Sequence, residues 1–151
     1  MDVDGTLTDG KIYIGNDGEL FKVFDVKDGS GIKDILIPAG INPVIITGRK
    51  SKILENRCKE LGIAALYQGV YNKLEVMNNL LKDTGFTYAN VAYIGDDIND
   101  LSCMESILVA GGVIGCPADA AKQIIQLSNY VCYKNGGNGA VREFIEWLLQ
   151  I

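Results

Sequence analysis

The chain contains no histidine, and this absence excludes several kinds of active site. A Ser-His-Asp triad, a Cys-His dyad and a zinc ion bound through imidazole all need a histidine side chain. Apolar runs stay well short of the ~18 residues that a membrane-spanning helix needs. The N-terminus also lacks the pattern of a signal peptide. We therefore expect a cytoplasmic protein with no membrane partner and no histidine chemistry.

Cysteines and basic residues are also few. The four cysteines are widely spaced and form no Cys-x-x-Cys pair, so neither a zinc knuckle nor a thioredoxin-type motif is expected. Their neighbours are apolar or helical, which predicts buried, unpaired thiols in a reducing compartment. The formal net charge is −5. This acidic balance argues against nucleic acid or an anionic membrane as a partner.

Glycine and apolar residues, in contrast, are abundant. The 151 residues include 18 glycines, and 48% of the chain is hydrophobic. Because only 3 prolines accompany them, the glycines indicate tight loops in an ordered fold and not low-complexity sequence. No repeat or linker interrupts the chain. We expect a single domain over residues 1–151 with a substantial hydrophobic core.

Short apolar runs alternate with segments of helical spacing. The runs predict strands at residues 42–47, 65–68, 91–95, 107–111 and 130–132. Apolar stripes predict helices over residues 32–39, 53–61, 74–81, 101–104, 121–125 and 141–149, several of them ended by glycine. This alternation is typical of an α/β fold, a doubly wound (Rossmann-like) parallel sheet with helices on both faces.

The first quarter of the chain departs from this alternation in two ways. Residues 11–25 have strand composition on both sides of Asn16-Asp17-Gly18, which predicts a β-hairpin flap and leaves no room for a large cap domain. In addition, a strand is expected before Asp2, yet only Met1 precedes it. We expect the chain to be truncated upstream, or numbered from an internal methionine.

Polar side chains gather where the predicted strands end. Asp2 and Asp4 open the chain, Thr47 ends one strand, Lys73 follows another, and Asp96 follows a third. Ligands of doubly wound sheets bind at the carboxyl ends of the strands. Carboxylates, a hydroxyl and a lysine are the groups that phosphoryl transfer through a carboxylate nucleophile and Mg²⁺ requires. A second carboxyl two residues after the first can serve as the general acid and base.

These residues resemble the four ordered motifs of the haloacid dehalogenase superfamily of phosphatases. The resemblance covers essentially the whole chain and implies Asp2 as the nucleophile and Asp4 as the general acid/base. It implies a Mg²⁺ site made by Asp2, Asp96 and the backbone carbonyl of Asp4. The groups expected to bind substrate through its phosphate or nearby oxygens are Thr47, Gly48, Lys73 and Asn99. Asp97 and Asp100 are expected to support the metal site or Lys73.

A closer resemblance is to the 3-deoxy-manno-octulosonate 8-phosphate phosphatases. It is carried by residues 2–10 with the following hairpin, by Ile46–Arg49, by residues 67–73 and by residues 136–143. Relatives act on nine-carbon keto-deoxy sugar acid phosphates, and others are C-terminal domains of acylneuraminate cytidylyltransferases. The resemblance implies a homotetramer in which neighbouring subunits help to close each site. A nine-carbon substrate and a catalytically idle oligomerisation module stay open as alternatives.

Two arginines are candidates for recognising a sugar carboxylate. Arg49 lies at the expected mouth of the site, and Arg57 is two helical turns further along the same predicted helix. Residues eight apart lie within about 80° of one another around a helix, so both can face one side. A planar guanidinium suits a carboxylate because it donates two parallel hydrogen bonds. The competing interpretation is that both are solvated helix charges.

Two other kinds of site also gather acidic residues, and one glycine-rich segment has two interpretations. A calcium loop starting at Asp2 would need glycine and glutamate where Leu7 and Tyr13 stand. A response-regulator receiver has an acidic pair, a phosphoacceptor aspartate, a Thr or Ser and a lysine in that order along its strands. Here Thr47 and Lys73 precede Asp96, and no aspartate ends the second strand. The glycine-rich segment 136–139 is either a flexible loop or an anion-facing loop at a helix N-terminus.

Overall fold

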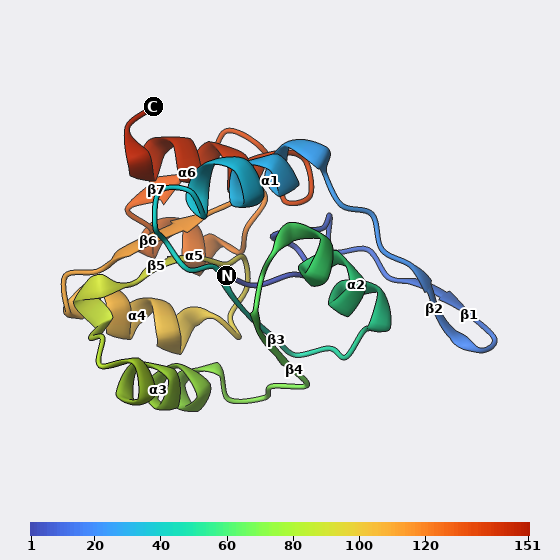
Figure 1. The fold of residues 1–151 in the computed structure, drawn as a ribbon, viewed down its shortest axis with the longest axis horizontal. Coiled ribbons are helices and arrows are strands. Elements are labelled where there is room, and N and C mark those ends of the chain that lie inside the picture. Colours follow the sequence, from blue (N-terminus) through green and yellow to red (C-terminus); the bar gives the residue numbers. More distant parts are fainter.

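Parallel strand pairs form the centre of the molecule (Figure 1). The computed structural model describes residues 1–151. β3 (Val44–Thr47) pairs in parallel with β4 (Ala65–Gln68). β5 (Ala92–Ile94), β6 (Val113–Cys116) and β7 (Tyr130–Val131) form a second parallel group in that order. The predicted α/β class with parallel strands is therefore confirmed.

Residues 1–3 connect these two groups of strands. The backbone nitrogen of Met1 donates to the Val44 carbonyl at 2.8 Å, and the Ile46 nitrogen donates to the Met1 carbonyl at 3.1 Å. One residue exchanging bonds with two residues spaced two apart is the pattern of parallel strands. On the other side, the Asp2 nitrogen donates to the Ile94 carbonyl at 3.1 Å. Asp2 thus lies between the ends of β3 and β5.

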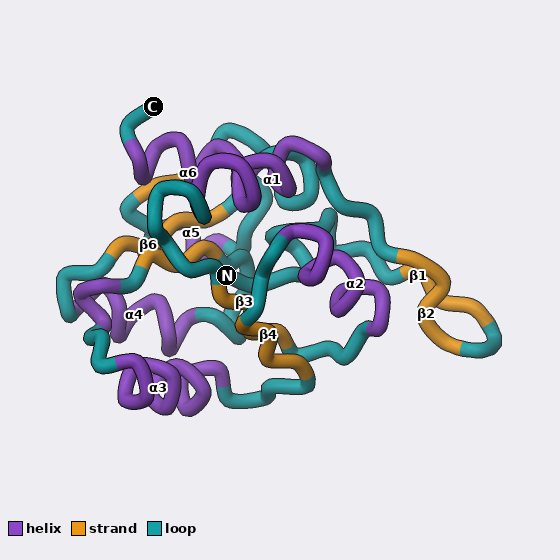
Figure 2. The backbone as a smooth tube through the Cα atoms, in the orientation of Figure 1, coloured by secondary structure: helices purple, strands orange, loops and turns teal.

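Helices cover both faces of this sheet (Figure 2). Ile45 and Ile46 are adjacent in β3, and because strand side chains alternate they belong to two different core clusters. The Ile45 cluster includes side chains from α2 (Lys52–Leu61), α6 (Ala140–Leu149) and the π-helix Gly31–Leu36 that continues α1 (Val26–Ser30). The Ile46 cluster includes side chains from α3 (Lys73–Thr84), α4 (Leu101–Val109) and α5 (Lys122–Leu127).

Most predicted elements are present near their expected bounds. Gly62 and Gly85 end α2 and α3 in the left-handed conformation, with φ of 76° and 74°. The hairpin consists of β1 (Tyr13–Gly15) and β2 (Gly18–Phe21), and it extends away from the helices (Figure 1). A single 3₁₀ turn, Tyr88–Asn90, precedes β5. None of the helices combines the length and hydropathy that crossing a bilayer requires.

The predicted strand at 107–111 is wrong. Ile107 to Val109 form the last turn of α4, and the strand of this region is β6, residues 113–116. Cys103, Met104 and Ile107 are all buried and share one helical face. A continuous apolar run fits a buried helix face as well as a buried strand, and here the helix continues through it.

The final helix is capped by a residue from the start of the fold. The Asp28 carboxylate accepts hydrogen bonds from the backbone nitrogens of Gly139 at 3.2 Å and Arg142 at 2.8 Å. These are the unpaired donors of the first turn of α6. Burial raises the pKa of Asp28 to about 6, although the two backbone donors oppose the shift. This bond pair fixes α6 and the glycine loop before it against α1.

Candidate active site

Three carboxylates meet at the carboxyl edge of the sheet. Asp2 lies in the central segment 1–3, Asp96 follows β5, and Asp100 is the N-cap of α4. One oxygen from each lies within 4.8 Å of the others. Asp2 and Asp100 are buried, and Asp96 is half-buried. Like charges this close are unfavourable unless cations lie among them.

Lys73 is the protein cation of this cluster. It is the first residue of α3, which begins after Asn72 accepts a capping hydrogen bond from the Glu75 nitrogen. Its Nζ lies 2.8 Å from Asp2 Oδ1 and 2.7 Å from Asp100 Oδ1, and the side chain is 2% exposed. One lysine does not balance three carboxylates. The arrangement therefore leaves net negative charge at the sheet edge.

Asp100 has its hydrogen-bonding capacity filled by the protein. Its Oδ1 accepts from Lys73 and from the Tyr93 hydroxyl at 2.6 Å. Its Oδ2 accepts from the backbone nitrogens of Asp96 at 3.1 Å and Asp97 at 3.4 Å. A carboxylate so occupied holds Lys73 and the loop in place and has no oxygen left for an external ligand. In this geometry Asp100 is a structural anchor of the loop and of Lys73, and its supporting role stays a prediction.

The other two carboxyls, Asp2 and Asp96, have fewer hydrogen-bond partners than Asp100. Asp2 Oδ1 is buried and, although Lys73 is close, it accepts no well-aligned hydrogen bond. Burial and the Asp100 charge raise the pKa of Asp2 despite Lys73. Burial also raises the pKa of Asp96 to about 7, although Thr6 Oγ1 donates to Asp96 Oδ1 at 2.8 Å. Two neighbouring carboxyls, one of them with a buried oxygen that accepts no hydrogen bond, fit a hard divalent cation such as Mg²⁺.

Lys73 keeps its charge in this environment. Burial alone would lower the pKa of its ammonium, but the charges of Asp100 and Asp2 raise it further than burial lowers it. A permanently charged donor directed at the edge of the sheet can bind a phosphoryl oxygen.

Asp4 and Gly5 form the turn beside the cluster. The Asp4 carboxylate is partly exposed and pairs with the ammonium of Lys22, which is the residue that follows β2. Gly5 has φ of +101°, and a Cβ added there would lie 2.0 Å from Asp96 Oδ2. Only glycine allows the backbone to pass this close to Asp96 with that conformation.

Two further groups of predicted residues lie at the ends of strands. Thr47 is buried at the end of β3, and Gly48 and Arg49 are exposed just after it. Asn99 and Asp97 are exposed in the loop between β5 and α4. These positions surround the carboxylate cluster, at the ends of the strands on either side of Asp2.

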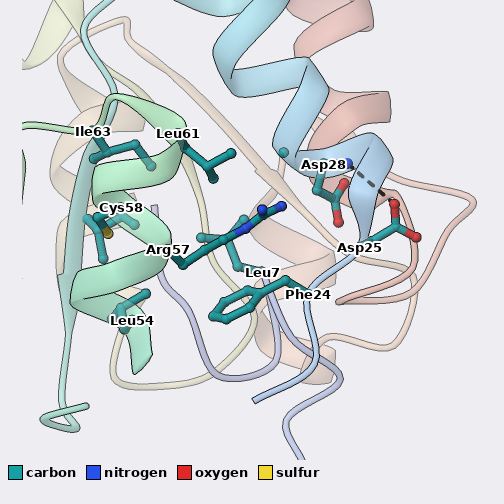
Figure 3. Close-up of a pocket in the computed structure, with 11 residues that line it drawn as sticks. Leu7, Phe24, Asp25, Asp28, Leu54, Arg57, Cys58, Leu61 and Ile63 are labelled. Atoms are coloured by element: carbon teal, nitrogen blue, oxygen red, sulfur yellow. Dashed lines mark hydrogen bonds between the residues drawn. The ribbon is translucent and has the colours of Figure 1, made fainter. Parts of the chain in front are cut away.

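Arg57 is placed elsewhere. It lies in a small pocket between α1 and α2, with its guanidinium 5.7 Å from the Phe24 ring centre and 2.8 Å from Glu60 (Figure 3). A Cβ on Gly29 would lie 2.2 Å from its Nη2. These contacts give Arg57 a packing role, and nothing brings it to the carboxylates.

The glycine loop at 136–139 supports the Asp4–Thr6 turn from behind. The Gly137 nitrogen donates to the Thr6 carbonyl at 3.0 Å. A Cβ on Gly136 would lie 1.8 Å from the Gly5 carbonyl oxygen. The backbone of this loop therefore packs directly on the backbone of the turn. The sequence alone allowed either a flexible loop or an anion-facing loop at this position.

Sequence reasoning missed Tyr93, Thr6 and Lys22. Tyr93 had a detectable signal, because a tyrosine in an apolar strand needs a partner for its hydroxyl. Thr6 lies within residues 2–10, which carry the family resemblance, but nothing in the sequence assigns a role to its hydroxyl. Lys22 had no signal, since a charged residue on a hairpin is ordinarily solvated.

Comparisons with known proteins agree on one family. No protein-family model matches the chain. A 3-deoxy-D-manno-octulosonate 8-phosphate phosphatase from Salmonella typhi is 47% identical over 149 residues, covering 99% of this chain and 77% of that protein. The crystal structure of the phosphatase of the same name from Yersinia pestis superposes with a TM-score of 0.92 at 44% identity, covering 99% of this chain and 78% of that one. The structure of the Moraxella catarrhalis phosphatase, in complex with magnesium, phosphate and KDO, gives a TM-score of 0.91 at 41% identity, covering 99% and 83% of the two chains.

We predict that Gly5→Ala disables cation binding at the carboxylate cluster. The added methyl group must displace Asp96, because it would otherwise overlap Oδ2. The melting temperature of the wild type should rise with Mg²⁺, and the Mg²⁺ concentration needed for the same rise should increase at least about tenfold in the variant, a loss of ~1.4 kcal/mol.

Gly40→Ala is the matched control. Gly40 also has positive φ, +81°, but no atom lies within 4 Å of the position of its Cβ. Both variants carry the strain of about 1–2 kcal/mol for a side chain at positive φ. Equal Mg²⁺ responses in the two variants would show that the approach of Gly5 to Asp96 does not matter.

Proposed function

Because the chain belongs to the family of 3-deoxy-D-manno-octulosonate 8-phosphate phosphatases, within the haloacid dehalogenase superfamily, we propose that it hydrolyses this eight-carbon sugar acid phosphate. The protein is a phosphatase. The products of the proposed reaction are the free sugar acid and phosphate, and the cofactor is Mg²⁺. The observation that carries the proposal is the cluster of Asp2, Lys73 and Asp96, in which a buried oxygen of Asp2 accepts no hydrogen bond.

Asp2 is the proposed nucleophile. Its carboxylate oxygen attacks phosphorus, the bond from phosphorus to the sugar oxygen breaks, and an aspartyl-phosphate forms. Lys73 binds a phosphoryl oxygen and offsets the charge that develops during transfer. Mg²⁺, held by Asp2, Asp96 and the Asp4 carbonyl, would neutralise phosphate charge so that an anionic carboxylate can approach.

Asp4 is the proposed general acid and base. It sits two residues after Asp2 and, unlike Asp2, is partly exposed to solvent. It protonates the sugar oxygen as the alcohol leaves, then takes a proton from the water that hydrolyses the aspartyl-phosphate. Each turnover returns Asp2 and Asp4 to their starting states.

Arg49 is the proposed partner of the sugar carboxylate. It is exposed just beyond Thr47, and it is close enough to Glu19 of the hairpin to influence the pKa of that group. The observation that favours the eight-carbon substrate over a nine-carbon relative is the identity of 47% to a phosphatase named for the former.

The hairpin is the proposed site of assembly into a homotetramer. Its large apolar side chains at Ile12, Ile14, Leu20 and Val23 are each at least half exposed. Such a surface on a projecting hairpin is normally covered by another chain. The cytoplasmic location expected from the cysteines belongs to the same proposal, and all four thiols are free and buried.

The first prediction concerns turnover. Purified protein should release phosphate from 3-deoxy-manno-octulosonate 8-phosphate only with Mg²⁺, and Asp2→Asn should remove turnover while leaving the circular dichroism spectrum unchanged. A panel of eight- and nine-carbon sugar acid phosphates ranks the substrates by kcat/KM. A higher kcat/KM for a nine-carbon substrate would replace the eight-carbon assignment, and Asp2→Asn within a few fold of wild type would end the proposed mechanism.

The second prediction concerns Arg49. Arg49→Ala should raise the KM for the sugar acid phosphate by about tenfold or more, since charge-assisted hydrogen bonds contribute about 1.5–3 kcal/mol. The KM for p-nitrophenyl phosphate, which has no carboxylate, should change little. Lys50→Ala, at the neighbouring exposed position, is the control. Equal increases on both substrates would assign Arg49 to the phosphate or to the fold.

The third prediction concerns assembly. Light scattering at micromolar concentration should give the mass of four chains, and Ile14→Glu should lower it because a charge would be buried in the interface. Ile98→Glu, at a comparably exposed isoleucine outside the hairpin, should leave the mass unchanged. A fully active monomer would contradict this assignment.

A further inference from the structure

Lys22 is a nearly buried lysine on a hairpin that is otherwise largely exposed. Its side chain is 5% exposed, whereas Phe21 and Val23 on either side are about half exposed. Its ammonium contacts Asp4 Oδ1 and lies 3.3 Å from Glu19 Oε1. No step of the proposed reaction uses it.

A second carboxylate anchors Lys22 from the opposite side to Asp4. Glu19 accepts a hydrogen bond from the Ser51 hydroxyl. Ser51 is the N-cap of α2, where its Oγ accepts from the Leu54 nitrogen at 3.2 Å and its own nitrogen donates to Gln68 Oε1 at 2.7 Å. The chain of contacts from Asp4 through Lys22 and Glu19 to Ser51 therefore ends on the helix that follows Thr47.

This arrangement differs from an ordinary surface ion pair. Lys11, on the same hairpin, pairs with Asp9 at 3.0 Å, but its side chain is 72% exposed. Exposed pairs of that kind contribute little and do not fix a side chain in one geometry. Holding a lysine still costs about 1.5–2 kcal/mol of side-chain entropy. Two carboxylates and near-complete burial offset that cost at Lys22.

The consequence for Asp4 is geometric. Lys22 occupies Oδ1 of Asp4, which leaves Oδ2 as the oxygen available to an incoming group. A carboxylate held at one oxygen has a fixed plane and cannot rotate freely about its terminal bond. Proton transfer needs such fixed geometry, because donor and acceptor must come within about 3 Å in line.

We propose that Lys22 is a positioning residue that presents the free oxygen of Asp4 to the leaving group. The proposal rests on the proposed function, in which Asp4 protonates the departing sugar oxygen. Lys22 forms no bond to substrate and acts only through Asp4. The hairpin thereby contributes to the chemistry of its own subunit, in addition to its proposed role in assembly.

The test compares two substrates whose leaving groups differ in how much they need a proton in order to depart. A sugar alkoxide is a poor leaving group and requires general acid help, whereas p-nitrophenolate leaves readily without it. The ratio kcat/KM reports only the steps up to departure of the leaving group. Lys22→Met should lower kcat/KM for the sugar acid phosphate by about tenfold or more, part of the ~10²–10⁴ that general acid catalysis contributes. For p-nitrophenyl phosphate the loss should stay below about threefold.

Matched variants separate positioning from structure. Lys22→Arg keeps a cation beside Asp4 and should recover most of the loss, and Lys11→Met should match the wild type on both substrates. Equal losses of Lys22→Met on both substrates, or no loss on either, would overturn the proposal. If Lys22→Met does not fold, Lys22→Gln keeps a neutral donor of similar length, and the same leaving-group comparison decides the question.

Wild type and Asp4→Asn are measured alongside. Failure of the wild type to hydrolyse the sugar acid phosphate would contradict the proposed function itself. If the wild type is active and Asp4→Asn loses the sugar phosphate selectively, the function stands. A Lys22→Met variant that then behaves like the wild type would contradict only the positioning role.

Discussion

The ion cluster of Lys73 with Asp2 and Asp100 is the interaction on which the rest of the structure depends. It joins three separate parts of the chain: the central segment 1–3, the start of α3 and the start of α4. Each of these charges is buried, so each is stable there only because the others are present. Removing one partner of such a pair typically costs about 3–5 kcal/mol. The cluster therefore fixes the central segment against the starts of α3 and α4, and through Tyr93 against β5.

Backbone contacts extend this constraint to the end of the chain. The glycine loop packs on the Asp4–Thr6 turn with no space for a side chain at Gly136. Asp28 then fixes that loop by accepting from the first turn of α6. Since the pKa of Asp28 is about 6, above the usual 3.8, the folded protein binds its proton more tightly than the unfolded chain does. The contribution of Asp28 therefore lowers the free energy of unfolding progressively as pH rises from about 4 to about 6. Below pH about 4 the group is protonated in both states and has no such effect.

The sequence predicts the positions of the buried site residues better than those of the long side chains around the site. Asp96 and Lys73 could be placed because they follow apolar runs, and the carboxyl ends of parallel strands must meet at one edge. Arg57 was placed at the site from helical spacing alone, but spacing does not say which neighbour a long side chain contacts, and here Phe24 and Glu60 hold it. The strand expected at 107–111 failed because an apolar run carries no periodicity to separate strand from buried helix.

The division between buried and exposed residues also divides the proposed chemistry. Lys73, Asp2 and Thr47, which would face the phosphate, are buried and held by the strands and helix starts of the core. Asp4, Arg49 and the hairpin, which would face the sugar, are partly or fully exposed and lie on turns. Turns can change without disturbing the packing of the core. The phosphate-handling half is therefore the part of the site that the fold constrains, and the choice of sugar depends on the turns around it.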